Sequence, residues 1–343
     1  MKALVLERYN ELIYKDVEEP SIEPGEVLVR VKACGICGSD VHGMDGSTGR
    51  RQPPLIMGHE AAGEIVATGS AVTQWEKGDR VTFDSTVYPL NDWYTLQGKY
   101  NLSDNREVMG VSANEFRRHG AFAEYVAVPA HILYKIPEGV SYEEAAMVEP
   151  VAVALHAIRI GKPQLAGSCV VVGAGMIGIF LVKLLSKAGL SNLIVVDINS
   201  KKREQALRCG AHLAFDPGDE HMISSMMKVT NSRGADISFE AVGITATVNI
   251  AIDSLRKGGK AVLLGNLTPT IDFPLQKVVT RELTILGSCA IKGEYEAVLN
   301  LLSKKDIHVR DQISEIAPLS DGAYWFGRLR QNNNGLNKVI LVP

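Results

Sequence analysis

The 343-residue sequence has no block of like charge, no long apolar run and no repeated or low-complexity segment. Because 36 basic residues stand against 39 acidic ones, the electrostatic footprint of a nucleic-acid-binding protein is absent. The most apolar run, 170–182, is shorter than the roughly 20 residues that span a bilayer. Glu7 and Arg8 interrupt the start of the chain before the apolar stretch of a secretory signal develops. We therefore expect a soluble, cytoplasmic protein whose partners include neither nucleic acid nor membrane.

Cysteine is scarce. The cysteines are odd in number and mostly isolated, which fits a reducing compartment. They are Cys34, Cys37, Cys169, Cys209 and Cys289. Hydrophobic residues make up 46% of the chain and charged residues 22%, which are values of a globular protein. The length exceeds one ordinary core and suits two domains.

The pattern of predicted secondary structure changes near residue 150. Before it, short segments rich in β-branched residues lie between Gly and Pro turns, as in a β-rich domain. These segments are EVLVRVKAC, GEIVATG, DRVTFDS and AEYVAVP. After it, apolar strands alternate with helical segments, which indicates a parallel doubly wound sheet. The alternation stops near residue 290, and we infer that the last segment returns to the first domain. We expect an α/β protein with one domain at 1–152 and 292–343 and another at 153–291.

The stretch VVVGAGMIG places Gly173, Gly175 and Gly178 after a predicted strand and at the start of a predicted helix. In a dinucleotide-binding turn these glycines permit the tight turn, the approach of the pyrophosphate and close helix–strand packing. The helix N-terminus then offers amides to the phosphates. Asp197 ends the next predicted strand, where its carboxylate would bind the ribose hydroxyls and repel a 2′-phosphate. We therefore predict NAD rather than NADP as the cofactor.

Neighbouring residues bear on the same site. Lys201, Lys202 and Arg203 follow Asp197 in the sequence and could accommodate a 2′-phosphate, but such residues are more often the solvated face of a helix. The residues that complete the predicted cofactor site are Met176, Ile177 and Val242.

A second group of residues has the chemistry of metal ligands. Cys37 and His42 lie in CGICGSDVHG, His59 and Glu60 lie in MGHEAAGEI, and Glu149 lies in VEPVAVALHA. One thiolate, one imidazole and one or two carboxylates suit zinc, and a catalytic zinc keeps three protein ligands and one open position. Spacing alone leaves two interpretations open, a metal site and a set of structural side chains.

Cys34 and Cys37 form a C-x-x-C pair, which could be redox-active. No thioredoxin-like helix pattern follows it, and redox exchange has no use for a His-Glu pair downstream. We interpret Cys34 as a buried apolar residue near the site.

Together these motifs resemble the zinc-dependent medium-chain alcohol and polyol dehydrogenases. The similar segments extend along essentially the whole chain and include GEVLVRVKACGICGSD, GHEAAGEIVATGSAV, KGDRV, GAFAEYV, VEPVAVALHA, GAGMIG and KVILVP. The sequence is most similar to the branch of sorbitol and galactitol-1-phosphate dehydrogenases, in which an acidic EP segment stands in place of a third cysteine ligand. The resemblance implies a GroES-like catalytic domain, built from both ends of the chain, and a Rossmann domain between them.

The resemblance also implies a zinc-ligand set. Cys37, His59 and Glu60 match the catalytic zinc ligands of the family. Glu149 matches an acidic residue that binds zinc directly or through a water.

Three further residues match the family's proton path and ligand support. Ser39 matches the hydroxyl that receives the substrate proton, and His42 matches the relay residue beyond it. Asp40 matches a carboxylate that orients the zinc-bound imidazole, a role with a general physical basis.

The segment 87–105, VYPLNDWYTLQGKYNLSDN, has neither strand alternation nor helical spacing. Many relatives carry four cysteines here, spaced C-x2-C-x2-C-x7-C, and bind a structural zinc. This sequence keeps the length but has Pro89, Asp92, Thr95 and Ser103 at those positions. Structural zinc sites use thiolate or imidazole, so we predict one catalytic zinc and no structural zinc. The side chains expected to hold this lobe by packing, in part against a neighbouring subunit of a homodimer or homotetramer, are Trp93, Tyr94, Tyr100 and Leu102.

The predicted reaction interconverts a secondary alcohol and its ketone by hydride transfer with NAD, and the predicted substrate is a polyol or sugar derivative. Basic residues near the cleft of relatives could bind a substrate phosphate or carboxylate, or could be ordinary surface residues. They are Arg50, Arg51, Arg117, Arg118 and His119. Two alternatives are a zinc-free, NADPH-dependent reductase of activated double bonds and a non-catalytic NAD-binding protein. Neither would need Cys37, His59 and Glu60.

Overall fold

The computed structural model describes residues 1–112, 118–331 and 335–343. These residues form two compact units. The first combines Met1–Glu149 with Ile291–Pro343, and the second is Pro150–Ala290. Among the described residues, no helix is both long enough and apolar enough to cross a bilayer.

The first unit is β-rich, and its main sheet has seven strands. Six of them follow the order β10-β6-β5-β3-β18-β17, and β9 also pairs with β3. Their bounds are β3 Glu26–Gly35, β5 Glu60–Thr68, β6 Arg80–Phe83, β9 Tyr125–Pro129, β10 Leu133–Lys135, β17 Ile313–Pro318 and β18 Lys338–Val342. The strands predicted from the β-branched segments of this half are thus confirmed.

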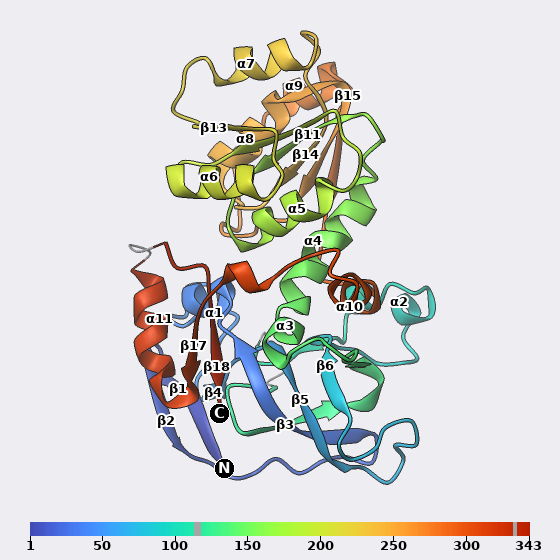
Figure 1. Ribbon diagram of the computed structural model, residues 1–343, viewed down its shortest axis with the longest axis vertical. Helices are drawn as coiled ribbons and strands as arrows, with labels where there is room; N and C mark the ends of the chain where they lie inside the picture. Colours follow the sequence, from blue (N-terminus) through green and yellow to red (C-terminus); the bar gives the residue numbers. More distant parts are fainter. Residues whose placement is uncertain (113–117, 332–334) are drawn as a thin grey trace. The chain divides into compact units, whose positions relative to one another are not determined.

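Both ends of the chain contribute to this sheet. The last strand, β18, pairs antiparallel with β3 through Ile340 opposite Gly35 and Leu341 opposite Cys34. Figure 1 shows the red strands β17 and β18 beside the blue strands of the N-terminal segment. Residues 338–342 therefore reach the end of β3, where the metal-ligand motif begins.

Smaller elements complete the first unit. The strands of a three-stranded sheet, ordered β2-β1-β4, are β1 Lys2–Arg8, β2 Glu11–Asp16 and β4 Leu55–Ile56. A two-stranded sheet joins β7 Thr86–Val87 and β8 Glu107–Val108. The helices are α1 Gly38–Gly43, α2 Trp93–Leu96, α3 Tyr142–Ala146, α10 Tyr295–Ser303 and α11 Gly322–Arg330. Helix α4, Val148–Gly161, begins in this unit and continues into the second.

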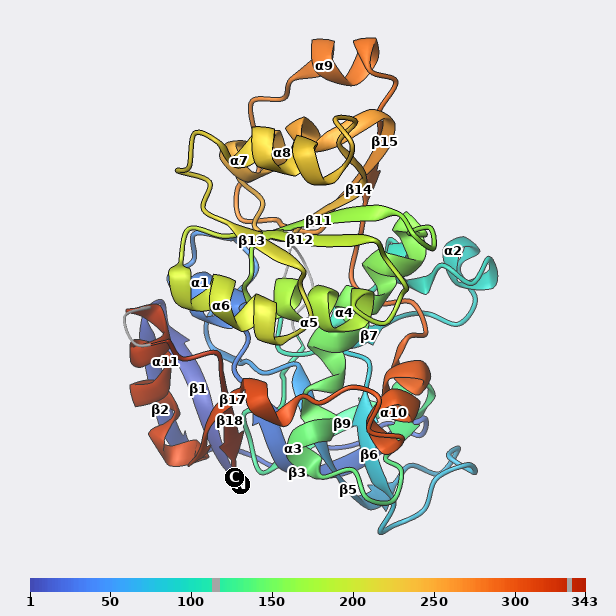
Figure 2. The ribbon, with the colours of Figure 1, turned by 45° about the horizontal axis from the view of Figure 1, so that its top comes forward.

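The second unit is a six-stranded parallel sheet with the order β13-β12-β11-β14-β15-β16. This is the order 3-2-1-4-5-6 of a Rossmann fold, in which the dinucleotide site lies where the order reverses, beside the first strand. The strands are β11 Ser168–Val172, β12 Asn192–Val196, β13 Leu213–Phe215, β14 Ala235–Glu240, β15 Leu255–Leu263 and β16 Thr284–Gly287. The helices are α5 Met176–Leu185, α6 Ser200–Arg208, α7 Met222–Val229, α8 Thr245–Asp253 and α9 Leu275–Thr280. In Figure 2, α5 and α6 cover one face of the sheet and α7 and α8 the other.

The lobe at 87–105 contains two short helical turns that the sequence pattern did not predict. Asp92 caps α2 by accepting a 2.7 Å hydrogen bond from the Thr95 backbone N–H, and its carboxylate also accepts from the Ser103 hydroxyl. Residues at three of the four family cysteine positions are therefore joined by hydrogen bonds. The ring of Trp93 packs edge-on against that of Tyr94, with 5.0 Å between centroids. Trp93 is nevertheless 66% exposed in the single chain, so its expected packing against a neighbouring subunit stays a prediction.

Tyr100 does hold the lobe. Its ring stacks on Tyr88 with 4.2 Å between centroids, and its hydroxyl donates a 2.7 Å hydrogen bond to the Asp84 carboxylate. The same hydroxyl accepts a hydrogen bond from the Gly293 backbone N–H. Asp84 is buried, and burial raises its pKa to about 6.

Candidate functional site

Cys37, His59 and Glu60 meet at one point of the first unit, where their ligand atoms all lie within 4.8 Å of one another. Cys37 lies at the N-terminus of α1, just after β3, and Glu60 is the first residue of β5. Strands β3 and β5 are paired so that Gly35 lies opposite Glu60. A side chain at Gly35 would place its Cβ 2.4 Å from Glu60 Oε2. Glycine at this position therefore leaves the space that the carboxylate occupies.

The donor set fits a zinc ion. A thiolate sulfur, an imidazole nitrogen and a carboxylate oxygen are the atoms that zinc takes in proteins, and three protein ligands leave one position for substrate. His59 and Glu60 are buried, whereas Cys37 is partly exposed. Of the three candidate ligands, Cys37 is therefore the one in contact with solvent.

The carboxylate of Asp40 lies next to the imidazole of His59. Its Oδ1 lies 3.5 Å from His59 Nδ1, so the imidazole can turn its other nitrogen toward Cys37 and a metal. Burial alone would raise the pKa of Asp40, but the neighbouring His59 and Arg51 outweigh burial and hold that pKa well below its ordinary value. The role implied for Asp40 thus agrees with the observed contact.

Lys338 is a site residue that the sequence reading missed. Its Nζ donates a 2.5 Å hydrogen bond to Glu60 Oε2 and a 3.0 Å hydrogen bond to the Ile36 carbonyl. The side chain is only 3% exposed. Burial opposes its charge, yet Glu60 raises the pKa of Lys338 above its ordinary value. The only signal in the sequence was the lysine that opens the strand KVILVP.

Glu149 does not join the three-ligand cluster. It is partly buried near the start of α4. Burial raises its pKa to about 7, against the opposing effect of His59 and with the support of Glu60. The role expected of Glu149, as a zinc ligand bound directly or through a water, therefore stays a prediction.

Ser39 is exposed beside Cys37 and contacts two polar groups. Its hydroxyl donates to Cys37 Sγ over 3.3 Å and accepts from Arg51 Nη2 over 3.2 Å. The side chain of His42 is exposed, and among the described residues no hydrogen bond joins it to Ser39. The structure places the hydroxyl at the metal site and leaves the relay to His42 without a direct contact.

Cys34 is fully buried, and burial raises its pKa well above the ordinary value of a thiol. It is a free thiol, as is Cys37. Its interpretation as a buried apolar residue is confirmed.

The basic residues considered for substrate binding separate into different roles. Arg118 is bound to Glu26 and, at 3.0 Å, to Glu107, so its charge is already balanced. His119 accepts a 3.2 Å hydrogen bond from the Ile56 backbone N–H. Arg51 is 2% exposed, and Arg117 lies outside the described residues. Arg50 is exposed and, within the described part of the chain, its guanidinium makes no hydrogen bond or ion pair.

The glycine turn of the second unit has the geometry of a dinucleotide site. Gly173 follows β11 with a φ of +92°, which a residue with a side chain rarely adopts. A Cβ at Gly178 would lie 1.8 Å from the Gly173 carbonyl oxygen, whereas a Cβ at Gly175 would meet open space. Met176 and Ile177 begin α5 directly after this turn. Val242 lies over it, since a Cβ at Gly173 would be 2.5 Å from Val242 Cγ2.

Asp197 is tied to the same turn. Its carboxylate accepts hydrogen bonds from the backbone N–H groups of Ala174, at 2.7 Å, and Asn199, at 2.8 Å. Arg203 donates to the Asp197 carbonyl at 2.7 Å and pairs with Asp216 at 2.9 Å. Because Arg203 is already bound to an acidic side chain, it is a poor candidate to neutralise a 2′-phosphate.

Comparisons with known proteins place both units among dehydrogenases. Residues 23–138 match the family model of the alcohol dehydrogenase GroES-like domain, and residues 177–304 match that of zinc-binding dehydrogenases. The chain is 30% identical over 348 residues to the sorbitol dehydrogenase of Bacillus subtilis, with 100% of this chain and 97% of that protein covered. It is 31% identical over 315 residues to the (R,R)-butanediol dehydrogenase of the same organism, with 89% and 88% covered. A protein of Sinorhizobium meliloti 1021, solved with NADP bound, is 29% identical at a TM-score of 0.90, with 100% of this chain and 99% of that chain covered.

Proposed function

The chain belongs to the zinc-type medium-chain polyol dehydrogenase family, and on that premise we propose that it interconverts a secondary alcohol of a polyol or sugar derivative and the corresponding ketone, with zinc and NAD. The observation that carries the proposal is the convergence of Cys37, His59 and Glu60 within 4.8 Å. Neither a zinc-free reductase nor a non-catalytic nucleotide-binding protein needs this set of donors.

A zinc ion held by these three residues would act as a Lewis acid on the substrate oxygen. The chain's own residues prepare the site for it. Asp40 orients His59, and Lys338 holds the Glu60 carboxylate at the start of β5. Two buried cations, Arg51 and Lys338, balance the negative charge that Asp40 and Glu60 bring into the interior.

Ser39 would exchange the proton of the alcohol. Its hydroxyl is exposed and lies 3.3 Å from Cys37 Sγ, within reach of a substrate oxygen bound at the open ligand position. His42 lies three residues after Ser39 in α1 and is exposed to solvent, so a water between Ser39 and His42 would complete the relay. The hydride would pass to the nicotinamide of NAD, which supplies the redox chemistry.

Asp197 supports NAD as the cofactor. Its carboxylate stands at the glycine turn, where it would accept hydrogen bonds from the ribose hydroxyls and repel the 2′-phosphate of NADP. The Sinorhizobium meliloti protein was solved with NADP bound, so family membership alone does not select NAD over NADP. The choice between the two cofactors is therefore to be measured.

A substrate panel tests the proposal. The purified protein would be assayed with NAD and with NADP against neutral polyols, polyol phosphates and sugar acids, before and after chelation and after return of zinc. We expect zinc-dependent oxidation of a secondary alcohol with NAD. Activity that survives complete metal removal, together with a preference for NADPH, would establish the zinc-free reductase instead. Bound NAD with no turnover of any member of the panel would favour the non-catalytic protein.

A further inference from the structure

Arg51 occupies an unusual position for a charged side chain. Among the residues that the structure describes, it is the only arginine that is as little as 2% exposed. Its Nη2 donates to Asp40 Oδ1 at 2.7 Å and to Ser39 Oγ at 3.2 Å, and its Nε lies 3.3 Å from the same Asp40 oxygen. One guanidinium therefore joins two neighbouring side chains of α1.

The chain around Arg51 is fixed from both sides. The Ser112 backbone N–H donates to the Arg50 carbonyl at 3.0 Å, and the Gln52 backbone N–H donates to the Ser112 hydroxyl at 2.6 Å. The side chain then runs across α1 at Gly43, where an added Cβ would lie 2.9 Å from Arg51 Cγ. The guanidinium is thus held by backbone contacts and by close packing as well as by charge.

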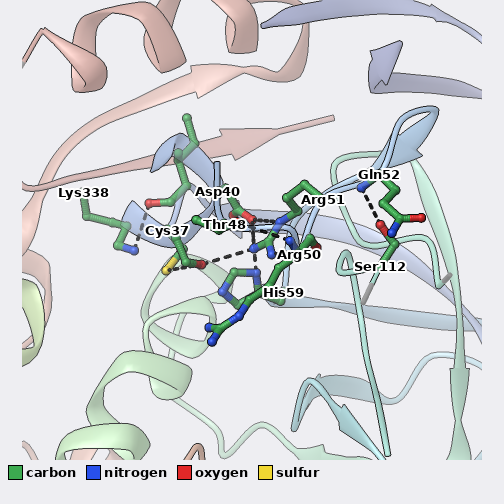
Figure 3. Close-up of polar contacts among 11 residues, drawn as sticks. Cys37, Asp40, Thr48, Arg50, Arg51, Gln52, His59, Ser112 and Lys338 are labelled. Carbon is green, nitrogen blue, oxygen red and sulfur yellow. Dashed lines mark hydrogen bonds and ion pairs between the residues drawn. The ribbon is translucent and has the colours of Figure 1, made fainter. Parts of the chain in front are cut away.

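The contact with Asp40 reaches the metal site through His59. Figure 3 shows the Arg51 guanidinium and the His59 ring both directed toward the Asp40 carboxylate. A carboxylate this deeply buried needs a paired charge to stay ionised, and an ionised Asp40 is the acceptor that fixes the orientation of the imidazole.

The contact with Ser39 reaches the proton-exchanging hydroxyl. A hydroxyl oxygen has two acceptor sites and one donor hydrogen. Arg51 occupies one acceptor site, so the hydroxyl hydrogen and the remaining acceptor site are left to face Cys37 and a substrate oxygen. Because Ser39 is exposed and Arg51 lies behind it, a substrate can reach the hydroxyl but not the guanidinium.

We propose that Arg51 is a positioning residue for the reaction, a single buried cation that fixes both the proton-exchanging hydroxyl of Ser39 and the Asp40 carboxylate that orients His59. The proposal rests on the function proposed above and adds a role for a residue first considered as a substrate contact. A simpler role, in which Arg51 only neutralises Asp40, predicts that any cation at position 51 would suffice.

Two substitutions separate these roles. In Arg51→Lys, the ammonium keeps the charge next to Asp40 but lacks the planar fork that reaches two acceptors. We expect zinc release to a chromogenic chelator to stay within about threefold of wild type and kcat to fall about 10- to 100-fold with little change in KM. In Arg51→Gln, we expect the same loss of kcat and zinc release about 10- to 100-fold faster. Arg256→Gln, which breaks an arginine–aspartate pair of the second unit, is the control and should change neither quantity.

A double variant tests the link to Ser39. When Arg51→Lys is introduced into the wild-type protein, kcat should fall. When it is introduced into the Ser39→Ala variant, kcat should not fall further, because the hydroxyl that Arg51 positions is already absent. The primary deuterium isotope effect on kcat, with a substrate deuterated at the oxidised carbon, should change in Arg51→Lys and not in the control.

The outcomes are distinct. A wild-type kcat in Arg51→Lys, or an equal loss in both backgrounds, would overturn the role toward Ser39. Unchanged zinc release in Arg51→Gln would overturn the role toward Asp40. If Arg51→Gln does not fold, as judged by circular dichroism, Arg51→Lys and the double variant decide; a failure of Arg51→Lys to fold counts against the proposal, because the whole fold would then depend on the residue. Failure of the proposed function would instead appear in the wild type, as a protein without zinc or without alcohol oxidation.

Discussion

The Nζ atom of Lys338 lies 2.5 Å from Oε2 of Glu60, although 278 positions separate the two residues in the sequence. The two side chains are 3% and 1% exposed. The pair exists because β18 pairs with β3 beside β5, which brings the last segment of the chain to the metal-ligand motif. A residue of the C-terminal segment thus places a buried positive charge against a candidate metal ligand.

Lys338→Met should destabilise the metal-free protein by about 3–5 kcal/mol, because removing one partner leaves a buried carboxylate without its counter-charge. Zinc should reduce the deficit, since the ion replaces the missing positive charge at Glu60. Urea unfolding with and without zinc measures both effects. Lys135→Met, which removes an exposed ion pair with Asp79, is the matched control and should cost measurably less. Equal costs for the two variants would show that the buried pair has no special weight.

Cys37→Ala should abolish zinc binding and turnover while NAD binding persists, because the thiolate lies in the first unit and the glycine turn in the second. Elemental analysis, steady-state kinetics and NADH fluorescence titration give the three readouts. Cys289→Ala removes an exposed thiol of the second unit and should leave all three unchanged. Full activity of Cys37→Ala would refute the assignment of the metal site.

Asp84 should make the unfolding free energy depend on pH. Burial raises its pKa from the ordinary 3.8 to about 6, so the folded protein prefers the protonated form. The stability contributed by protonated Asp84 is therefore complete below about pH 4 and is lost as the pH rises through about 6. The free energy of unfolding of the wild type, measured relative to that of Asp84→Asn, should fall by on the order of 3 kcal/mol between pH 4 and pH 7.

A control of opposite sign is available in Asp79. A hydrogen bond from Lys135 lowers the pKa of Asp79, so its contribution is present above the ordinary pKa and is lost as the pH falls. The free energy of unfolding of the wild type should therefore increase relative to that of Asp79→Asn as the pH rises from about 3 to 5. Parallel pH profiles for the two variants would contradict the assignment of opposite shifts.

Asp197→Ala should lower the affinity for NAD about 10- to 100-fold, which corresponds to the loss of hydrogen bonds to a charged group. The preference for NAD over NADP should fall, because the repulsion of the 2′-phosphate is removed as well. Dissociation constants for NADH and NADPH measure the change. Asp253→Asn, which affects an exposed pair with Lys277 in the same unit, should leave them unaltered. A variant that still prefers NAD as strongly as the wild type would assign the selectivity to another residue.

The thiol-free lobe should bind no metal and should contribute to subunit contact. We expect one zinc per chain by elemental analysis, and Asp92→Ala should leave that number unchanged while limited proteolysis within 88–103 becomes faster.

Leu90, Trp93 and Leu96 are 62%, 66% and 69% exposed, so a neighbouring subunit has an apolar surface to cover. The double variant Trp93→Ser, Leu96→Ser should lower the molar mass measured by light scattering. A second zinc per chain, or an unchanged mass, would contradict the corresponding half of this prediction.

The sequence by itself determined what is encoded by contiguous residues. The strand, glycine turn and helix around Gly173 and Gly178 follow from local apolar pattern and from backbone sterics. Cys37, and His59 with Glu60, are recognisable because each motif combines ligand chemistry with turn residues over a few positions. The burial of Cys34 also follows from its place in an apolar strand.

Only the tertiary structure decided which distant side chains meet. In the sequence, Arg51 and Lys338 look like ordinary surface basic residues. Nothing local shows that Arg51 will be buried against Asp40 of α1, or that Lys338 of β18 will be buried against Glu60. Tyr100 and Asp84 meet for the same reason, and the exposed Trp93 shows that an aromatic residue in an irregular loop does not reveal whether it packs. The physical reason is that burial and charge pairing depend on how elements pack, which joins side chains 11, 16 and 278 positions apart in these three pairs. A turn or a ligand motif needs only its immediate neighbours.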